Sequence, residues 1–506
     1  MIGSLRTIYN GSSLPLADLP EAASREFLQS ILDAVERGWR IVSYFGIPAV
    51  AETSLFCVLA NRAESLLAVT RTCAKDDHFP SLAALCPQVQ LFEREIAEQC
   101  GLIFADHPWF KPVRFHRPLA AGRDAWSRPA DEPLRVGVMD YFQVAGDEVH
   151  EVAVGPVHAG IIEPGHFRFQ CHGEEVFHLE ISLGYQHRGI EAALLGGPHP
   201  RTLQVMETAA GDTTIGHGQA YCMVMEALAG IKVPPRAEVL RGVALELERL
   251  ANHSGDLGAI AGDVGYLPTA SFCGRIRGDF LNMTAVLCGS RFGRGLLTPG
   301  GTIFDLTREH CDDLLKRLHE ARRDLTGAVE LLLNTPSVMA RLEGTGPVSQ
   351  ESALELGLVG PAARACGIKQ DVRNDYPFGI YRMTNLPVAT AFDGDVYSRT
   401  MIRWQEVQKS MDFIEEQLRQ LPGGGHRAKT MPCAGQRLAV ALTEGWRGEI
   451  CHVAITDDLG RFARYKIVDP SFHNWQGLAM ALRGQQISDF PLCNKSFNLS
   501  YCGFDL

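Results

Sequence analysis

The segment from Met206 to Gly218, METAAGDTTIGHG, places two residues suited to acid–base chemistry just before an apolar helical pattern. These residues are Asp212 and His217. A carboxylate and an imidazole at the start of a buried helix suit proton transfer, because burial and neighbouring charges can move their pKa values. A structural reading is favoured for each: Asp212 as the N-cap of the helix, and His217 as a hydrogen-bonded core histidine.

A second candidate segment is GYQHRGIEAALL, residues 184–195. It contains His187, Arg188 and Glu191. Arg188 and Glu191 are three positions apart, which suits an ion pair within one helical turn. A structural and a functional role for the three residues remain equally open.

The cysteines argue against a metal site built by this chain alone. There are 14 of them, and the closest two, Cys493 and Cys502, are nine positions apart. Zinc and iron–sulfur sites usually take two ligands two or three positions apart. We therefore expect buried, inert thiols. No phosphate-binding loop or dinucleotide fingerprint is found, so no nicotinamide or flavin site is expected.

Charge and hydropathy exclude several classes of protein. The net charge is −11 with a pI near 5.9, which argues against nucleic-acid binding and against adhesion to anionic lipid. The sequence has no apolar run of about 18 residues and no secretory signal. Any membrane association is therefore expected to come through partner subunits.

The elements that would position these residues fall into two parts. A helix over 24–39, strand-like runs over 39–47, 54–61 and 64–72, and a helix running into a strand over 89–104 predict an α+β domain. We place this domain at 1–115, a linker at 116–135 and a larger domain at 136–506. The larger domain should begin with β-hairpins and continue with long helices. One of these starts near Pro235, with Leu240, Val243, Leu247 and Leu250 as its apolar stripe and with Glu246 and Arg249 off the stripe.

Six segments in order resemble one known family. FEREIAEQCGLIFADHPWFKPVRF (92–115) resembles the C-type subunit of respiratory NADH:quinone oxidoreductase (complex I), and GYQHRGIEAALL resembles the start of its D-type subunit. The second block also occurs in the large subunit of related membrane-bound [NiFe] hydrogenases such as formate hydrogenlyase. Further matching blocks span 231–258, 341–349, 357–381 and 394–410. The resemblance implies a fused C/D chain: a small α+β domain beside a helix-rich domain with peripheral β-hairpins.

The same resemblance shows where this chain departs from the hydrogenase pattern. The four cysteine positions of the family fall on Ala210, Thr213, Ser500 and Gly503. Nickel in such a site requires soft, anionic sulfur, which these residues do not supply. The sequence therefore predicts no [NiFe] centre, no hydrogen cleavage and no cofactor bound by this chain.

The family's quinone site is altered as well. The tyrosine that holds the quinone headgroup in the family falls on Gly211, and the family's histidine belongs to a hairpin where this chain offers His158 and His166. These two histidines are weak candidates for quinone binding. By resemblance, Asp212, His217, His187, Arg188 and Glu191 could instead line a polar, water-filled cavity suited to proton transfer.

The resemblance implies a large subunit of a complex-I-like, energy-converting complex on the cytoplasmic face of the inner (plasma) membrane. The implied partners are a small, B-type iron–sulfur protein, another iron–sulfur subunit of the peripheral arm, and antiporter-like membrane subunits. Electron transfer from the iron–sulfur protein would be coupled to proton or ion movement. The alternatives are a quinone-reducing subunit with a divergent site, and a non-catalytic scaffold.

Overall fold

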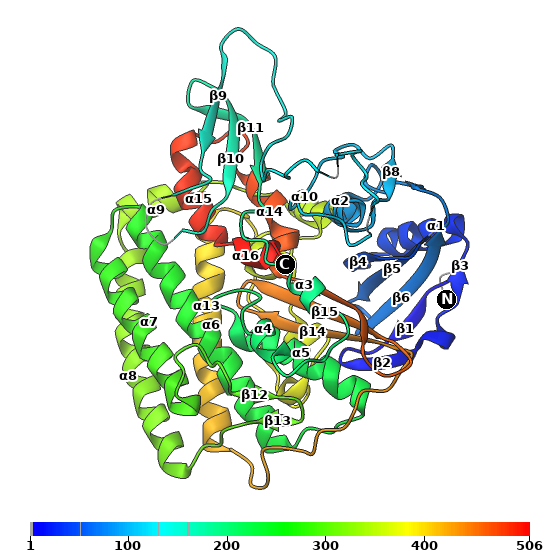
Figure 1. The fold of residues 1–506 in the computed structure, drawn as a ribbon. Helices are drawn as coiled ribbons and strands as arrows, with labels where there is room; N and C mark the ends of the chain where they lie inside the picture. Colours follow the sequence, from blue (N-terminus) through cyan, green and yellow to red (C-terminus); the bar gives the residue numbers. More distant parts are fainter. Residues whose placement is uncertain (1–3, 51, 121, 130, 159–161) are drawn as a thin grey trace.

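A five-stranded sheet forms the core of the N-terminal part (Figure 1). The computed structural model describes residues 4–50, 52–120, 122–129, 131–158 and 162–506. The strands β1 (Arg6–Ile8), β6 (Leu66–Ala74), β5 (Thr53–Asn61) and β4 (Arg40–Pro48) are antiparallel in this order, and β3 (Glu21–Ala22) pairs with β6 in parallel. With α1 (Ser24–Glu36) and α2 (Gln90–Cys100), these strands confirm the predicted α+β domain.

Helix α2 is buried along almost its whole length, although it carries three glutamates. Their carboxylates are buried because each has partners in neighbouring segments. Glu98, for example, accepts hydrogen bonds from the backbone N–H groups of Arg114 and Phe115 at 2.8 and 2.7 Å. The helix ends at Gly101, whose left-handed φ of 68° stops it before β8 (Ile103–Ala105), as predicted from the sequence.

A bundle of long helices forms the larger part: α5 (Thr214–Ala229), α6 (Pro235–Asp263), α7 (Leu267–Cys288), α8 (Arg308–Leu333) and α13 (Val396–Arg419). Helix α6 lies between the others, and the predicted stripe of leucines and valine is buried. Glu246 and Arg249 are off this stripe, as predicted, yet both are fully buried. The helix is surrounded on more than one face, and these two charges pair with each other at 3.0 Å.

The remaining elements are short, and most join the long ones. A peripheral three-stranded sheet, at the top of Figure 1, consists of β9 (Val149–Val154), β10 (His166–His172) and β11 (Glu175–Ser182) and confirms the predicted hairpins. The others are η1 (Leu16–Asp18), β7 (His78–Pro80), η2 (Pro87–Val89), α3 (Ile190–Ala193), α4 (Thr202–Met206), β12 (Leu297–Thr298), β13 (Gly301–Thr302), α9 (Pro336–Leu342), α10 (Gln350–Leu356), α11 (Gly360–Ala365), α12 (Val372–Asp375), η3 (Gly379–Arg382), α14 (Pro470–Ala481), η4 (Ile487–Asp489), α15 (Phe490–Phe497) and α16 (Tyr501–Phe504).

A second, almost wholly buried sheet joins the two ends of the chain. Its order is β16 (Phe462–Val468), β15 (Gly448–Thr456), β14 (Arg437–Gly445) and β2 (Ser12–Pro15). The edge strand β2 comes from the N-terminal part and pairs with β14 of the larger part. The two parts therefore share one sheet across the predicted boundary at 115. The boundaries themselves stay a prediction. The C-terminal residues Tyr501 to Leu506 are buried near the centre of the molecule (Figure 1).

No helix in the described part of the chain combines the length and the apolar character that crossing a bilayer requires. All 14 cysteines are free; 12 are buried and two are half-buried, which agrees with the expected burial of the thiols.

Candidate functional site

The start of α5 is held by a carboxylate from another helix. The N-cap residue is Thr213, and no side chain of its own segment caps the helix. Instead, Glu248 of α6 accepts hydrogen bonds from the first free amides of α5, Ile215 N–H at 2.7 Å and Gly216 N–H at 3.1 Å. The structural reading of Asp212 as the N-cap is therefore wrong, because the carboxylate that meets these amides belongs to Glu248.

Asp212 instead forms an ion pair with Arg447. The two side chains meet through two contacts, at 2.5 and 2.8 Å. Arg447 lies in the two-residue turn between β14 and β15, with its guanidinium 3.8 Å from the centre of the Trp446 ring. Its Nε donates to the carbonyl of Asn498 at 2.5 Å. One guanidinium therefore bridges the 210–213 turn and the C-terminal segment.

His217 belongs to a buried chain of hydrogen bonds. Its Nε2 lies 3.0 Å from Asp469 Oδ2, and its Nδ1 lies 3.1 Å from His452 Nε2. His452 Nδ1 lies 2.9 Å from the hydroxyl of Tyr465. All four side chains are at most 1% exposed, so a proton can be passed along Asp469–His217–His452–Tyr465 without contact with bulk water. The reading of His217 as a hydrogen-bonded core residue is confirmed, and the hydrogen-bonded chain leaves a proton-transfer role open.

Burial and neighbouring side chains set the protonation states of Asp469 and His452 in this hydrogen-bonded chain. Burial raises the pKa of Asp469, but the hydrogen bond and charge of His217, together with the charge of Arg447, outweigh burial and bring it below its usual range. Burial and the neighbouring His217 hold the pKa of His452 well below its usual range, so this imidazole is neutral. Asp469 is therefore the anionic end of the chain.

The same carboxylate fills the space beside Gly503. A Cβ atom added to Gly503 would lie 2.7 Å from Asp469 Cγ, which is closer than real Cβ contacts. Position 503 therefore cannot carry a thiol unless Asp469 or α16 moves. At the facing turn, a Cβ added to Gly211 meets nothing within 4 Å.

This contrast gives a matched pair of substitutions. Gly503→Ala is expected to lower the free energy of unfolding by about 1–3 kcal/mol, the usual cost of overpacking a core. Gly211→Ala should change it by less than about 0.5 kcal/mol. Urea denaturation followed by circular dichroism measures both. Equal effects of the two substitutions would contradict the close approach of Asp469 to Gly503.

The four positions that correspond to hydrogenase cysteines do not fit a thiolate-bound metal. Thr213 Oγ1 accepts from the Trp446 indole at 3.2 Å, and Ser500 Oγ accepts from Gly503 N–H at 2.9 Å as the N-cap of α16. Ala210 and Gly503 carry no donor atom. Among the residues that the structure describes, no group of three or more His, Cys, Asp or Glu side chains is arranged to hold a metal ion.

The three candidate residues of segment 184–195 do not lie together. Arg188 donates to the carbonyls of Thr208 and Ala209 at 2.8 and 3.0 Å, beside the 210–213 turn. His187 Nδ1 lies 3.3 Å from the Asp505 carbonyl, and its ring stacks on His116 with centres 4.5 Å apart. Burial lowers the pKa of His187 to about 4, so it is neutral at pH 7.

Glu191 is directed elsewhere, into a buried ion cluster between the two parts of the chain. Its carboxylate lies 2.9 Å from both Arg464 and Lys466, and it accepts from Ile467 N–H at 3.0 Å. Lys466 also contacts Glu95 of α2 at 2.7 Å. The suggested Arg188–Glu191 ion pair is wrong, and Glu191 joins β16 to the N-terminal part instead.

His158 and His166 lie at the hairpin next to the C-terminal segment. His166 Nε2 accepts from Arg168 Nε at 3.2 Å, and His158 Nε2 lies 3.0 Å from the Gly165 carbonyl. The loop between them approaches the C-terminal segment, since Glu163 accepts from Tyr501 N–H at 3.3 Å. Residues 159–161 of this loop lie outside the described residues. Quinone binding by either histidine stays a prediction.

Of the five residues expected to line a water-filled cavity, Asp212 borders a void of about 10 Å³, which has room for about one water molecule. That His187, Arg188, Glu191 and His217 line a shared cavity with Asp212 stays a prediction.

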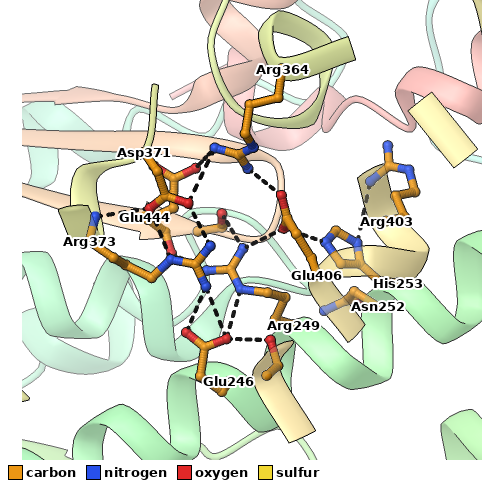
Figure 2. A network of polar contacts seen from close by, with 12 residues as sticks. Glu246, Arg249, Asn252, His253, Arg364, Asp371, Arg373, Arg403, Glu406 and Glu444 are labelled. Carbon is orange, nitrogen blue, oxygen red and sulfur yellow. Dashed lines mark hydrogen bonds and ion pairs between the residues drawn. The ribbon is translucent and has the colours of Figure 1, made fainter. Parts of the chain in front are cut away.

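A network of buried charges lies in the helix bundle next to this site, and Figure 2 shows its part around Arg249 and Glu406. Asp256 contacts the Asn498 amide on one side and Arg403 at 2.9 Å on the other. His253 lies 3.6 Å from Asp256 and 3.0 Å from Glu406. Together with Arg447 and Asn498, these contacts connect Asp212 to the interior of the bundle.

The network continues from Glu406 towards α12. Arg364 joins Glu406 at 2.7 Å to Glu444 at 2.8 Å, and Arg373 joins Asp371 at 2.6 Å to Glu246 at 3.0 Å (Figure 2). Burial and the nearby Asp371 raise the pKa of Glu444, while the charges of Arg364, Arg373 and Arg249 lower it.

Two carboxyl groups beside the 210–213 and 500–503 turns have pKa values near neutral pH. Burial raises the pKa of Glu248 to about 8, although the two α5 amides lower it. Burial likewise raises the pKa of Asp505 to about 7. These groups can take up or release a proton near physiological pH, which is what a proton-coupled site requires.

Glu248 predicts a specific pH dependence of stability. Its folded pKa exceeds the unfolded value of about 4.3, so the folded state holds more protons and stability falls as pH rises between about 4 and 8. Glu248→Gln removes this fall, so the wild type should lose more stability than the variant between pH 5 and pH 9. Urea denaturation at both pH values measures the difference. Glu309→Gln, on the exposed start of α8, is the control and should lose as much as the wild type. An identical pH slope in Glu248→Gln would show that Glu248 is ionised throughout.

Sequence reasoning missed Arg447, His452, Asp469 and Glu248. Only Asp469 has a local signal, because an aspartate before proline is typical of an N-cap, and it does accept from Ser471 N–H at 2.8 Å. The other three reach the site through sheet and helix packing, which no spacing in the sequence reveals.

Comparisons with known proteins agree with this architecture. The model of the respiratory-chain NADH dehydrogenase 30 Kd subunit matches residues 23–135, and that of the 49 Kd subunit matches 263–437 and 428–505. The carbon monoxide-induced hydrogenase of Rhodospirillum rubrum is 32% identical over 350 residues, which cover 69% of this chain and 97% of the relative. Formate hydrogenlyase subunit 5 of Escherichia coli is 31% identical over 448 residues, 85% of this chain and 77% of the relative.

A relative with both parts in one chain is the C/D subunit of NADH-quinone oxidoreductase from Bdellovibrio bacteriovorus. It is 25% identical over 454 residues, 81% of this chain and 80% of the relative. With the two family models in the same order along the chain, this match supports the fused arrangement. The chain belongs to the family of fused 30 and 49 Kd (C/D-type) subunits of NADH dehydrogenase and the related hydrogenase large subunits.

Proposed function

We propose that this chain is the large peripheral-arm subunit of a complex-I-like, energy-converting redox complex, and that it works without a [NiFe] centre. It passes protons in response to electron transfer from a neighbouring small, B-type iron–sulfur protein. A second iron–sulfur subunit and antiporter-like membrane subunits complete the complex, which lies on the cytoplasmic face of the inner membrane. The proposal rests on the family membership and on the chemistry at the 210–213 and 500–503 turns, where the cysteine positions of the hydrogenases fall.

One observation carries the proposal: protein charges occupy the space between the turns where the family pattern would place a metal. The guanidinium of Arg447 joins Asp212 to Asn498, and the carboxylate of Asp469 lies against Gly503. Soft, anionic donors are absent at the four matching positions. A fixed cation and a fixed anion at this place suit charge compensation rather than metal binding.

The titratable groups around the turns supply a route for protons. Asp469, His217 and His452 form one hydrogen-bonded chain, and Glu248 lies under the first turn of α5. An electron arriving on a nearby cluster in the partner would favour proton uptake by these groups, since negative charge raises their pKa values. The network from Asp256 to Glu444 would carry the change into the bundle.

The test begins with metal analysis of the purified complex. Iron in the partner subunits and no stoichiometric nickel is the expected result, and one nickel per chain would contradict the proposal. The combined variant Asp212→Asn, His217→Gln and Asp469→Asn should then abolish ion movement driven by electron transfer. Full activity of this variant would favour the scaffold role.

Quinone reduction is the second candidate, favoured by the open space at Gly211 and by the contact of the His158–His166 loop with the C-terminal segment. A quinone would then bind beside Gly211. Inhibition of the complex by a quinone-site inhibitor, lost in His166→Ala, would support it. Turnover unaffected by the inhibitor would exclude it.

A further inference from the structure

A cleft of about 370 Å³ lies beside the C-terminal helix α16, where the N-terminal part meets the rest of the chain. Its walls come from α2, the 108–113 segment, β11, α14 and the C-terminal helix α16. Its apolar lining residues include Leu91, Trp109, Val113, Leu179, Trp475 and Phe504. A cleft of this size and composition suits a small molecule with a flat apolar body.

Arg94 is a charged residue of the cleft lining that has N–H donors without an acceptor. Arg94 is 9% exposed and forms no ion pair among the described residues. It donates to the carbonyls of Lys111 and Pro112, at 2.8 and 3.0 Å, and to Gln90 at 3.5 Å. Because a guanidinium has five N–H donors, two remain for another acceptor. Burial lowers the pKa of Arg94 to about 10, so it is still cationic at pH 7.

The charge balance of the cleft favours an anion. Both oxygens of its lining carboxylate, Glu180, are occupied, by Lys111 at 2.8 Å and by Phe142 N–H at 2.7 Å. Arg94 and the exposed Arg483 then remain as positive charges without a paired carboxylate among the described residues.

We propose that this cleft binds a small organic acid with a flat apolar body, its carboxylate at Arg94 and its body against Leu91, Trp109 and Trp475. The ligand touches residues matched by the 30 Kd model (83–113) and by the 49 Kd model (475–504). Its binding therefore stabilises the junction of the two parts of the chain. This inference does not depend on the proposed redox function.

The experiment uses 2-naphthoate as probe and the neutral 2-naphthalenemethanol as its uncharged counterpart, titrated calorimetrically into the full chain. One molecule of naphthoate should bind per chain, about tenfold more tightly than the alcohol, because a charge-assisted contact contributes roughly 1.5 kcal/mol or more. Arg94→Gln should remove this preference, and Arg483→Gln should reduce it. Leu91→Trp, which fills the cleft, should abolish binding of both probes.

Arg308→Gln, at an exposed arginine on α8 outside the cleft, is the matched control and should bind as the wild type does. Each variant is checked for folding by its thermal midpoint. If Arg94→Gln fails to fold, Arg483→Gln and Leu91→Trp decide the question. Equal affinity for acid and alcohol, unchanged binding in Leu91→Trp, or no binding by the wild type at about 1 mM probe would each overturn the proposal.

Discussion

Replacing Glu191 by alanine is expected to lower the free energy of unfolding by about 3–5 kcal/mol, because it removes the buried carboxylate that pairs with Arg464 and one of the two that contact Lys466. Arg464 and Lys466 each contact this carboxylate at 2.9 Å, and both are about 1% exposed. Glu64→Ala, at an exposed site in the N-terminal part, is the control and should change stability by less than about 0.5 kcal/mol. Urea denaturation measures both variants.

The effect of Glu191 should depend on pH in a defined direction. Burial raises its pKa, but the charges of Lys466, Arg464 and Arg114 outweigh burial and hold it well below the usual range. A carboxyl whose folded pKa is depressed stabilises the folded state above its unfolded pKa of about 4.3, and loses that contribution as pH falls. The difference between wild type and Glu191→Ala should therefore be full at pH 7 and shrink below pH 4. A constant difference over this range would mean that the loss comes from packing alone.

Asp469→Asn is expected to lower turnover of the complex by about 100-fold, within the range usual for loss of an acid–base group. Asparagine keeps the size of the side chain beside Gly503 but removes the charge that faces His217 at 3.0 Å. The anionic end of the Asp469–His217–His452 chain is then lost. Electron transfer from a dye donor and ion uptake by vesicles containing the complex measure the two halves of the reaction.

The control for Asp469→Asn is Asp458→Asn, an exposed aspartate in the turn between β15 and β16, which should keep full turnover. Loss of turnover together with loss of the assembled complex would point to a structural effect, so assembly is checked by size-exclusion chromatography. An assembled Asp469→Asn complex with wild-type turnover and ion uptake would show that the hydrogen-bonded chain is structural only.

Local patterns were enough to predict most of the fold. The helix near Pro235, the strands over 39–72 and the hairpins after 136 are set by apolar periodicity and by glycine and proline, which act within a few residues. The pairing of β2 with β14 could not be predicted in this way, because its partners are more than 400 residues apart in the chain.

The candidate site likewise has one part that follows from the sequence and another that depends on the tertiary structure. The sequence by itself determined that Ala210, Thr213, Ser500 and Gly503 offer no thiolates, since donor chemistry depends only on residue type. Only the tertiary structure decided what lies between the two turns. Arg447 reaches them from the turn between β14 and β15, and Asp469 from the N-cap of α14, both distant in sequence from the first turn. Glu191 pairs instead with cations on β16. Buried charges take whichever partners the fold brings within reach, because leaving one unpaired costs more than any local spacing preference contributes.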